Sequence, residues 1–161
     1  MRVPVQWANP TQFTVPIPPD EKERLADLQS FKILDTPPEE ELDNLTQLAA
    51  HICATPMAVI SLVDASRQWF KARVGVDLTG TPREQAFCAY AILQPDLLIV
   101  PDATQDERFA RNPLVTAGPQ IRFYAGAPLV SPDRHVLGTL CVIDQVPRQL
   151  TQQQTEALRA L

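Results

Sequence analysis

The sequence predicts an α+β fold in which helices lie beside a central antiparallel β-sheet. Three observations lead to this fold class. Two pairs of short extended runs, within residues 57–74 and 122–143, are each joined by a turn, as in β-hairpins. A long irregular crossover separates the hairpins, and helical patterns stand before the first hairpin and after the second. Such hairpins form antiparallel sheets with helices packed beside them, rather than parallel sheets with alternating helices.

Two helices are expected before the first hairpin. The first begins at Asp20, a residue type that caps helices, and has acidic residues in its first turn, where the helix dipole favours them. The second opens at Thr36 or Pro38 and ends near Ala54. Its apolar residues recur at spacings of three and four, which predicts one apolar face: Leu42, Leu45, Leu48, Ala49 and Ile52.

The remaining elements follow from apolar runs, alternation and turn residues. Residues 57–63 are apolar and β-branched, as in a buried strand, and residues 68–74 alternate as its partner, with Trp69 or Phe70 facing inward. The other expected elements, in chain order, are a loop at 75–82, a helix at 83–93, a strand at 97–100, a short helix at 112–115, strands at 122–130 and 136–143, and a helix at 151–161.

Composition bounds the class of protein. The 161 residues are the usual size of one domain, and a hydrophobic fraction of 45% suffices for a full core. The net charge of −5 argues against a general nucleic-acid binder, which needs a basic face. No apolar run approaches the length of a membrane span and no signal-peptide core is visible, so we expect a cytoplasmic protein. Five prolines mark residues 1–19 as a flexible or extended leader.

Cysteine and histidine placement argues against metal and disulfide sites. Cys53, Cys88 and Cys141 are odd in number and widely spaced, which fits neither a disulfide framework nor a structural zinc site. His51 and His135 have no partner at metal-ligand spacing. No Gly-x-Ser-x-Gly motif of a serine hydrolase occurs. Buried, reduced thiols are therefore expected, and the sequence requires no cofactor.

The chain resembles a large subgroup of bacterial GAF domains over about residues 21–161. The resemblance is specific because several separate stretches carry it together. These stretches are Arg24-Leu25 with Leu28 and Ile33 to Glu39, Val63-Asp64 with Arg67 to Ala72, Arg83-Glu84 with Phe87 to Ile92, Arg122 to Leu129, and Gly138 to Asp144.

The resemblance implies a sensor rather than an enzyme. GAF domains of this subgroup have an antiparallel sheet of five or six strands and sit upstream of histidine-kinase, cyclase or phosphodiesterase output domains. The implied division is a leader at 1–19, the sensor domain at 20–150, and the start of a connector helix at 151–161. The resemblance also implies a homodimer through the terminal helices, an output domain in the parent protein, and an unidentified small-molecule ligand.

The same resemblance places a ligand pocket over one face of the sheet, under the crossover. Arg122 is expected to pair with Asp102 or another acid rather than to bind an anion. The candidate pocket residues are Trp69, Phe70, Phe87, Cys88, Tyr90, Asp102, Arg122, Phe123, Tyr124, Thr139 and Cys141. The candidate dimer residues are Leu42, Leu45, Leu48, Leu158 and Leu161. The leucine stripe has a second interpretation, in which it packs on the sheet.

Four alternatives stay open. In photosensory GAF domains a cysteine in the region of Cys88 binds a linear tetrapyrrole, usually with histidine after it, whereas Ala89 follows here. Cyclic-nucleotide-binding GAF domains show an Asn-Lys pair that this chain lacks. A GAF-fold methionine sulfoxide reductase needs clustered redox cysteines, and the sequence does not place Cys53 or Cys141 near Cys88. A final possibility is a ligand-free dimerisation module whose pocket is filled by its own side chains.

Overall fold

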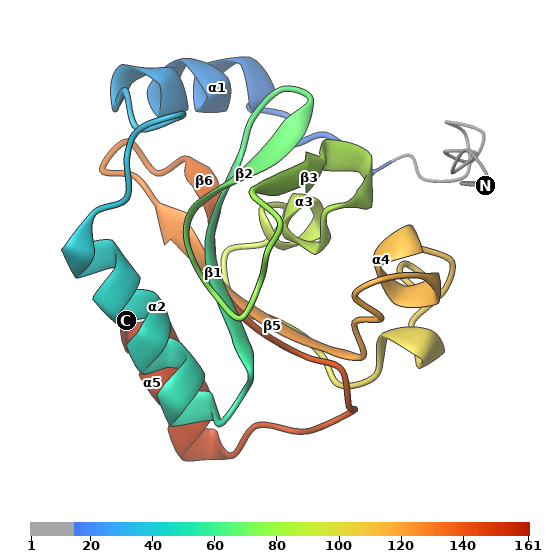
Figure 1. Ribbon diagram of the computed structural model, residues 1–161. Helices are drawn as coiled ribbons and strands as arrows, with labels where there is room; N and C mark the ends of the chain where they lie inside the picture. Colours follow the sequence, from blue (N-terminus) through green and yellow to red (C-terminus); the bar gives the residue numbers. More distant parts are fainter. Residues whose placement is uncertain (1–14) are drawn as a thin grey trace.

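The computed structural model describes residues 15–161, and its centre is a six-stranded antiparallel sheet (Figure 1). The strand order is β3-β2-β1-β6-β5-β4, and every neighbouring pair is antiparallel. The strands are β1 (Met57–Val63), β2 (Arg67–Val74), β3 (Gly80–Pro82), β4 (Leu98–Val100), β5 (Phe123–Val130) and β6 (Val136–Asp144). The two predicted hairpins are confirmed as β1–β2 and β5–β6, and β1 pairs with β6 at the centre.

Three helices lie on one face of the sheet: α1 (Glu21–Ser30), α2 (Glu40–Cys53) and α5 (Gln152–Ala160). Figure 1 shows α2 and α5 side by side on this face, with α1 across one end. Ala49 and Cys53 of α2 and Leu158 of α5 are fully buried against the sheet. This helix layer and the sheet together form one of the apolar cores of the domain.

The end of α2 is held by one side chain from the segment between β6 and α5 and by one from the first turn of α5. Ala54 takes the left-handed conformation that terminates many helices. Arg148 donates to the carbonyls of Cys53 and Ala54 at 2.9 and 2.8 Å, and Gln154 donates to the carbonyl of Ile52 at 3.1 Å. Because helix ends leave carbonyls unpaired, these bonds tie α5 to α2 as well as capping it.

α1 is tied to the sheet by buried charge. Arg24 is 1% exposed and donates to the carbonyl of Val63 at 2.8 Å. Glu21 accepts hydrogen bonds from Arg24 and from Arg83, which lies directly after β3. One carboxylate therefore joins α1 to the far edge of the sheet.

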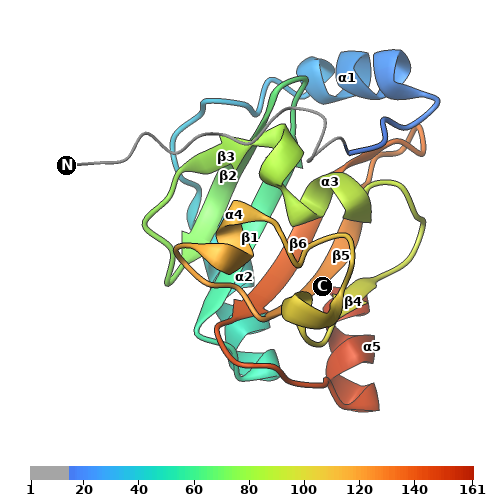
Figure 2. The ribbon, with the colours of Figure 1, turned by 90° about the vertical axis from the view of Figure 1, so that its right-hand side faces the viewer.

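The crossover covers the opposite face of the sheet, as Figure 2 shows. It contains α3 (Phe87–Ala91), α4 (Pro113–Thr116) and two short 3₁₀ turns at Arg83–Gln85 and Ala103–Gln105. The single helix expected at 83–93 is therefore wrong, because the extended backbone of Ala86 separates the first 3₁₀ turn from α3.

The loop expected at 75–82 contains a strand that sequence reasoning missed. β3 pairs with β2 at its outer edge, with Gly80 opposite Trp69. A Cβ on Gly80 would lie 2.5 Å from the carbonyl oxygen of Gln68, so glycine permits this close approach. Part of the expected leader, residues 1–14, lies outside the described residues. Residues 15–18 form neither helix nor strand, and α1 begins at Glu21.

Candidate functional site

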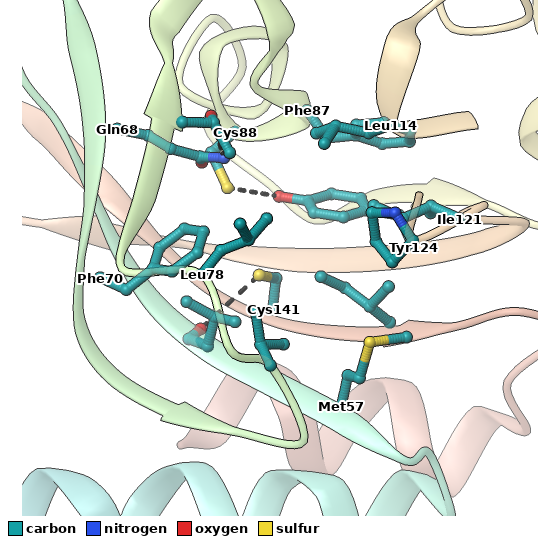
Figure 3. A pocket seen from close by; sticks show the side chains of 15 residues that line it. Met57, Gln68, Phe70, Leu78, Phe87, Cys88, Leu114, Ile121, Tyr124 and Cys141 are labelled. Atoms are coloured by element: carbon teal, nitrogen blue, oxygen red, sulfur yellow. Dashed lines mark hydrogen bonds between the residues drawn. The ribbon is translucent and has the colours of Figure 1, made fainter. Parts of the chain in front are cut away.

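A small cavity of about 40 Å³ lies between the sheet and the crossover (Figure 3). Its floor is formed by side chains that alternate onto one face of β1 and β6. The register sets Val59 opposite Cys141 and Met57 opposite Ile143, and all four of these side chains line the cavity. α3, the β2–β3 loop and the segment before β5 form the remaining walls. The surface of the cavity is almost entirely apolar.

A cluster of buried thiols and hydroxyls forms the polar part of this cavity. The Cys88 sulfur lies 3.2 Å from the Tyr124 hydroxyl and 3.0 Å from the Thr139 hydroxyl. The two hydroxyls are 3.4 Å apart. Cys141 follows two residues after Thr139 on the same face of β6, and its thiol points to the Val59 carbonyl at 3.6 Å. All four side chains are at most 3% exposed.

A second buried chain of hydrogen bonds runs beside the thiols. Ser61 donates to the side-chain oxygen of Gln68 at 2.8 Å, and the amide nitrogen of Gln68 donates to Thr81 at 2.8 Å. Thr81 in turn donates to the carbonyl of Pro82 at 3.0 Å. These groups satisfy one another, as buried polar groups must to avoid a desolvation penalty. The bond between Gln68 and Thr81 ties β3 to β2 on the face of the sheet that lines the cavity.

The two thiols have opposite pKa shifts. Burial raises the pKa of Cys88, but the polar side chains around it, Cys141, Thr139, Tyr124 and Ser61, lower it to about 6, below the usual value. The hydrogen bond to Cys88, together with burial, raises the pKa of Cys141 well above the usual value. Burial and the nearby Cys88 likewise raise the pKa of Tyr124. The first proton to leave this cluster therefore comes from Cys88.

The size and charge of the cavity limit what it holds in this conformation. Ligand pockets for drug-sized molecules usually have about 300–1,000 Å³, whereas a single water needs about 10–15 Å³ of this measure. A cavity of about 40 Å³ accommodates something the size of a few waters, not a cyclic nucleotide or a tetrapyrrole. Among the described residues, none that lines it is cationic, so nothing in its wall pairs with a phosphate.

The structure brings together six of the eleven pocket residues expected from the sequence. Five of them line the cavity, and Thr139 joins them through its contact with Cys88. Phe87 stacks on Phe109 with ring centroids 4.1 Å apart, which closes the cavity on the crossover side. The five cavity-lining residues are Phe70, Phe87, Cys88, Tyr124 and Cys141.

The other five candidates lie away from this cavity. Trp69 and Phe123 pack on the helix-covered face, because strand alternation sends them opposite to Phe70 and Tyr124. Tyr90 is half-buried and meets the edge of Phe109. Asp102 caps a 3₁₀ turn by accepting from the backbone of Thr104.

The expected pairing of Arg122 with an acid is wrong. The guanidinium donates to the carbonyls of Val115 and Ile121 at 2.9 and 3.1 Å. Arg122 therefore anchors the crossover to the start of β5. A carbonyl partner several residues away leaves no trace in a residue pattern, whereas an acid–base pair suggests itself from composition.

Sequence reasoning missed most of the apolar wall and the second polar chain. Ser61 stands in an otherwise apolar strand, and this was the available signal for a polar group facing the cavity. Nothing in the residue pattern marks Gln68 or Thr81, because their role depends on the β2–β3 pairing. The other residues missed are Met57, Val59, Val76, Leu78, Leu114, Pro119, Ile121 and Ile143.

A second candidate surface lies on the outer side of the α2–α5 layer. Leu48 is 46% exposed, and Leu42, Leu45 and Leu161 are half-buried. Leu158 is fully buried against the sheet and is unavailable for a dimer contact. The inner residues of the α2 stripe pack on the sheet, as one of the two interpretations expects. Its outer residues face away from the sheet and stay candidates for a dimer contact.

Residues 15–161 contain neither a membrane-spanning helix nor a cluster of metal ligands. No described helix is long and apolar enough to cross a lipid bilayer. No group of three or more potential metal ligands clusters within that part of the chain. His51 is exposed on α2. His135, in the β5–β6 turn, lies 2.9 Å from the carboxylate of Asp27 on α1.

The chain resembles part of a larger curated protein. It is 46% identical over 135 residues to a cyclic di-GMP phosphodiesterase of Pseudomonas aeruginosa, which covers 84% of this chain but 23% of that protein. The chain thus spans about a quarter of the length of this relative. The stretch that matches is one portion of a much longer polypeptide.

Solved structures show the same fold at low sequence identity. The GAF domain of an Acinetobacter phosphoenolpyruvate-protein phosphotransferase superposes with a TM-score of 0.63 at 17% identity, covering 89% of each chain. A type II free methionine-R-sulfoxide reductase from Thermoplasma acidophilum superposes with a TM-score of 0.61 at 13% identity, covering 83% of this chain and 89% of that one. The GAF domain family model matches residues 37–161. With the six-stranded sheet, the crossover and this match in agreement, the chain belongs to the GAF domain family.

Proposed function

We propose that this chain is a non-catalytic regulatory domain of a longer signalling protein, and that it acts by pairing with a second copy of itself. The observation that carries the proposal is the apolar stripe on the outer side of α2. Leu48 is 46% exposed on a helix whose neighbours Leu45 and Ile52 are only half-buried. A helix face of this kind next to α5 is suited to a helix-to-helix contact between two chains.

The output domain is the second part of this proposal. The 46% identical relative is a cyclic di-GMP phosphodiesterase, so an output domain that acts on cyclic di-GMP is our preferred partner within the parent chain. Pairing through α2 and α5 would change the relative position of two such output domains. A signal acts on this pairing only if it favours one arrangement of the helices over another.

Ligand binding is secondary in this proposal. The side chains that surround the cavity leave about 40 Å³, which favours a self-filled pocket or a very small ligand. Native mass spectrometry of the purified protein separates these cases, because a retained ligand adds mass to the chain. The same spectrum gives the ratio of monomer to dimer.

The dimer is tested with a charge placed on the stripe. Leu48→Glu should convert the dimer to a monomer in light scattering at matched concentration, because a carboxylate at an apolar contact must be desolvated without a partner. Val130→Glu is the control, since Val130 is 54% exposed but lies at the end of β5, off the helix layer. A wild-type chain that stays monomeric at high concentration, or a Leu48→Glu chain that stays dimeric, would contradict the proposed pairing.

A further inference from the structure

The thiols of Cys88 and Cys141 are the two nucleophilic groups that the fold, but not the sequence, brings together. One stands on α3 of the crossover and the other on β6. Both sulfurs line the same cavity, as Figure 3 shows. Cys88 contacts Thr139 at 3.0 Å, and Cys141 follows two residues later on the same face of β6, so the two thiols are close neighbours in the cavity wall. Both cysteines are free, and both are at most 3% exposed.

We propose that Cys88 and Cys141 are a redox modification site, at which a hydroperoxide that enters the cavity converts the two thiols to an intramolecular disulfide. The cavity is the first support for this assignment. Its volume of about 40 Å³ exceeds the 10–15 Å³ or so that one water requires, so a peroxide group has room beside the sulfurs. Leu78 lines the cavity on its inner side and is 44% exposed on its outer side, so a single side chain separates this wall from solvent.

The chemistry balances with the hydroperoxide as the sole oxidant. The Cys88 thiolate attacks one peroxide oxygen, the O–O bond breaks, and Cys88 becomes a sulfenic acid while an alcohol or water leaves. The Cys141 sulfur then attacks the sulfenic sulfur, an S–S bond forms, and water leaves with the Cys141 proton. Two thiols lose two electrons and two protons in total, and the peroxide takes up both.

The surroundings assign the two roles. Cys88 has the hydroxyls of Thr139 and Tyr124 at 3.0 and 3.2 Å, and these neighbours hydrogen-bond a thiolate. The pKa of Cys88 is lowered, which favours its thiolate over that of Cys141. The pKa of Cys141 is raised, which favours its protonated form and leaves Cys88 as the thiol that reacts with the peroxide first.

The third cysteine provides an internal control. Cys53 is buried in α2 on the opposite face of the sheet, where burial raises its pKa. The sheet therefore separates it from the cavity and from both other thiols. A Cys53→Ser background leaves only the two cysteines of interest and removes any competing pairing.

The experiment treats the reduced Cys53→Ser protein with hydrogen peroxide, then alkylates the remaining thiols under denaturing conditions and maps the peptides by mass spectrometry. We expect an 88–141 disulfide that dithiothreitol reverses, with a rate that rises as pH passes through about 6. Cys88→Ser in the same background should react at least tenfold more slowly. Cys141→Ser should stop at a sulfenic acid that dimedone traps on Cys88, which keeps the test valid if either variant is less stable.

Some results would overturn the inference. The inference fails if both thiols stay free at a peroxide concentration that fully oxidises free cysteine. It also fails if the only disulfide that forms links two separate chains. Turnover of free methionine-R-sulfoxide would replace it with the reductase alternative. Reading the disulfide as a signal rests on the proposed regulatory function. The bond itself does not, because the thiol readout is independent of whether Leu48→Glu alters the oligomeric state.

Discussion

Glu21→Gln should weaken the attachment of α1 more than any comparable change on the helix surface. Glu21 is the shared partner of two buried arginines: Arg24, which is 1% exposed, and Arg83, which is 7% exposed. Burial raises the pKa of Glu21, but hydrogen bonds from Arg83 and Arg24 lower it, from 4.5 to about 2. Each factor of ten in an ionisation constant is about 1.4 kcal/mol, so this change corresponds to about 3 kcal/mol. Because the Glu21 side chain is 18% exposed and partly screened by water, we expect a loss of about 2–3 kcal/mol at pH 7.

The pH dependence gives this prediction its sign. A carboxyl group with a lowered pKa stabilises the folded state fully above its unfolded pKa of 4.5, and the effect is lost as pH falls through about 2. Urea unfolding should therefore show the full difference between wild type and Glu21→Gln at pH 7 and about half of it at pH 3. Glu23→Gln is the matched control, because Glu23 is exposed in the same helical turn. Equal losses for the two variants, or a Glu21→Gln difference that does not shrink at pH 3, would refute the reasoning.

Two further predictions concern the backbone. Gly138→Ala should cost more than about 3 kcal/mol in thermal unfolding or prevent folding, because its Cβ would lie 1.8 Å from the carbonyl oxygen of Ser61 in the neighbouring strand. Gly118→Ala is the control, since a Cβ there meets nothing within 4 Å, and it should match wild type in the same experiment. Thr151→Ala should cost about 1 kcal/mol and speed amide exchange at the start of α5, since Thr151 and Gln154 form a capping box with bonds of 3.1 and 2.9 Å; unchanged exchange there would contradict this role.

Residue patterns alone predict the fold class and most of the helices and strands. Local patterns suffice for these, because apolar spacing and turn residues act within a few positions of each other. Residues 57–63 and 136–143 were expected as strands from their apolar runs, and the structure has strands at Met57–Val63 and Val136–Asp144. The α2 stripe likewise follows from spacing alone. β3 was missed since three residues with a glycine and a proline carry no strand pattern, and only pairing with β2 makes them one.

Which side chains share the cavity depends on long-range packing, which no local pattern records. Alternation predicts that Phe123 and Tyr124 face opposite sides of a strand, but not which side the crossover covers. The meeting of Cys88 with Thr139 and Cys141 depends on where α3 rests on β6, across about fifty residues of chain. Long-range packing also made Leu158 a core residue and left Leu48 outside, although both are leucines on helices expected from the sequence. Periodicity specifies a face, whereas burial depends on what the rest of the chain places against that face.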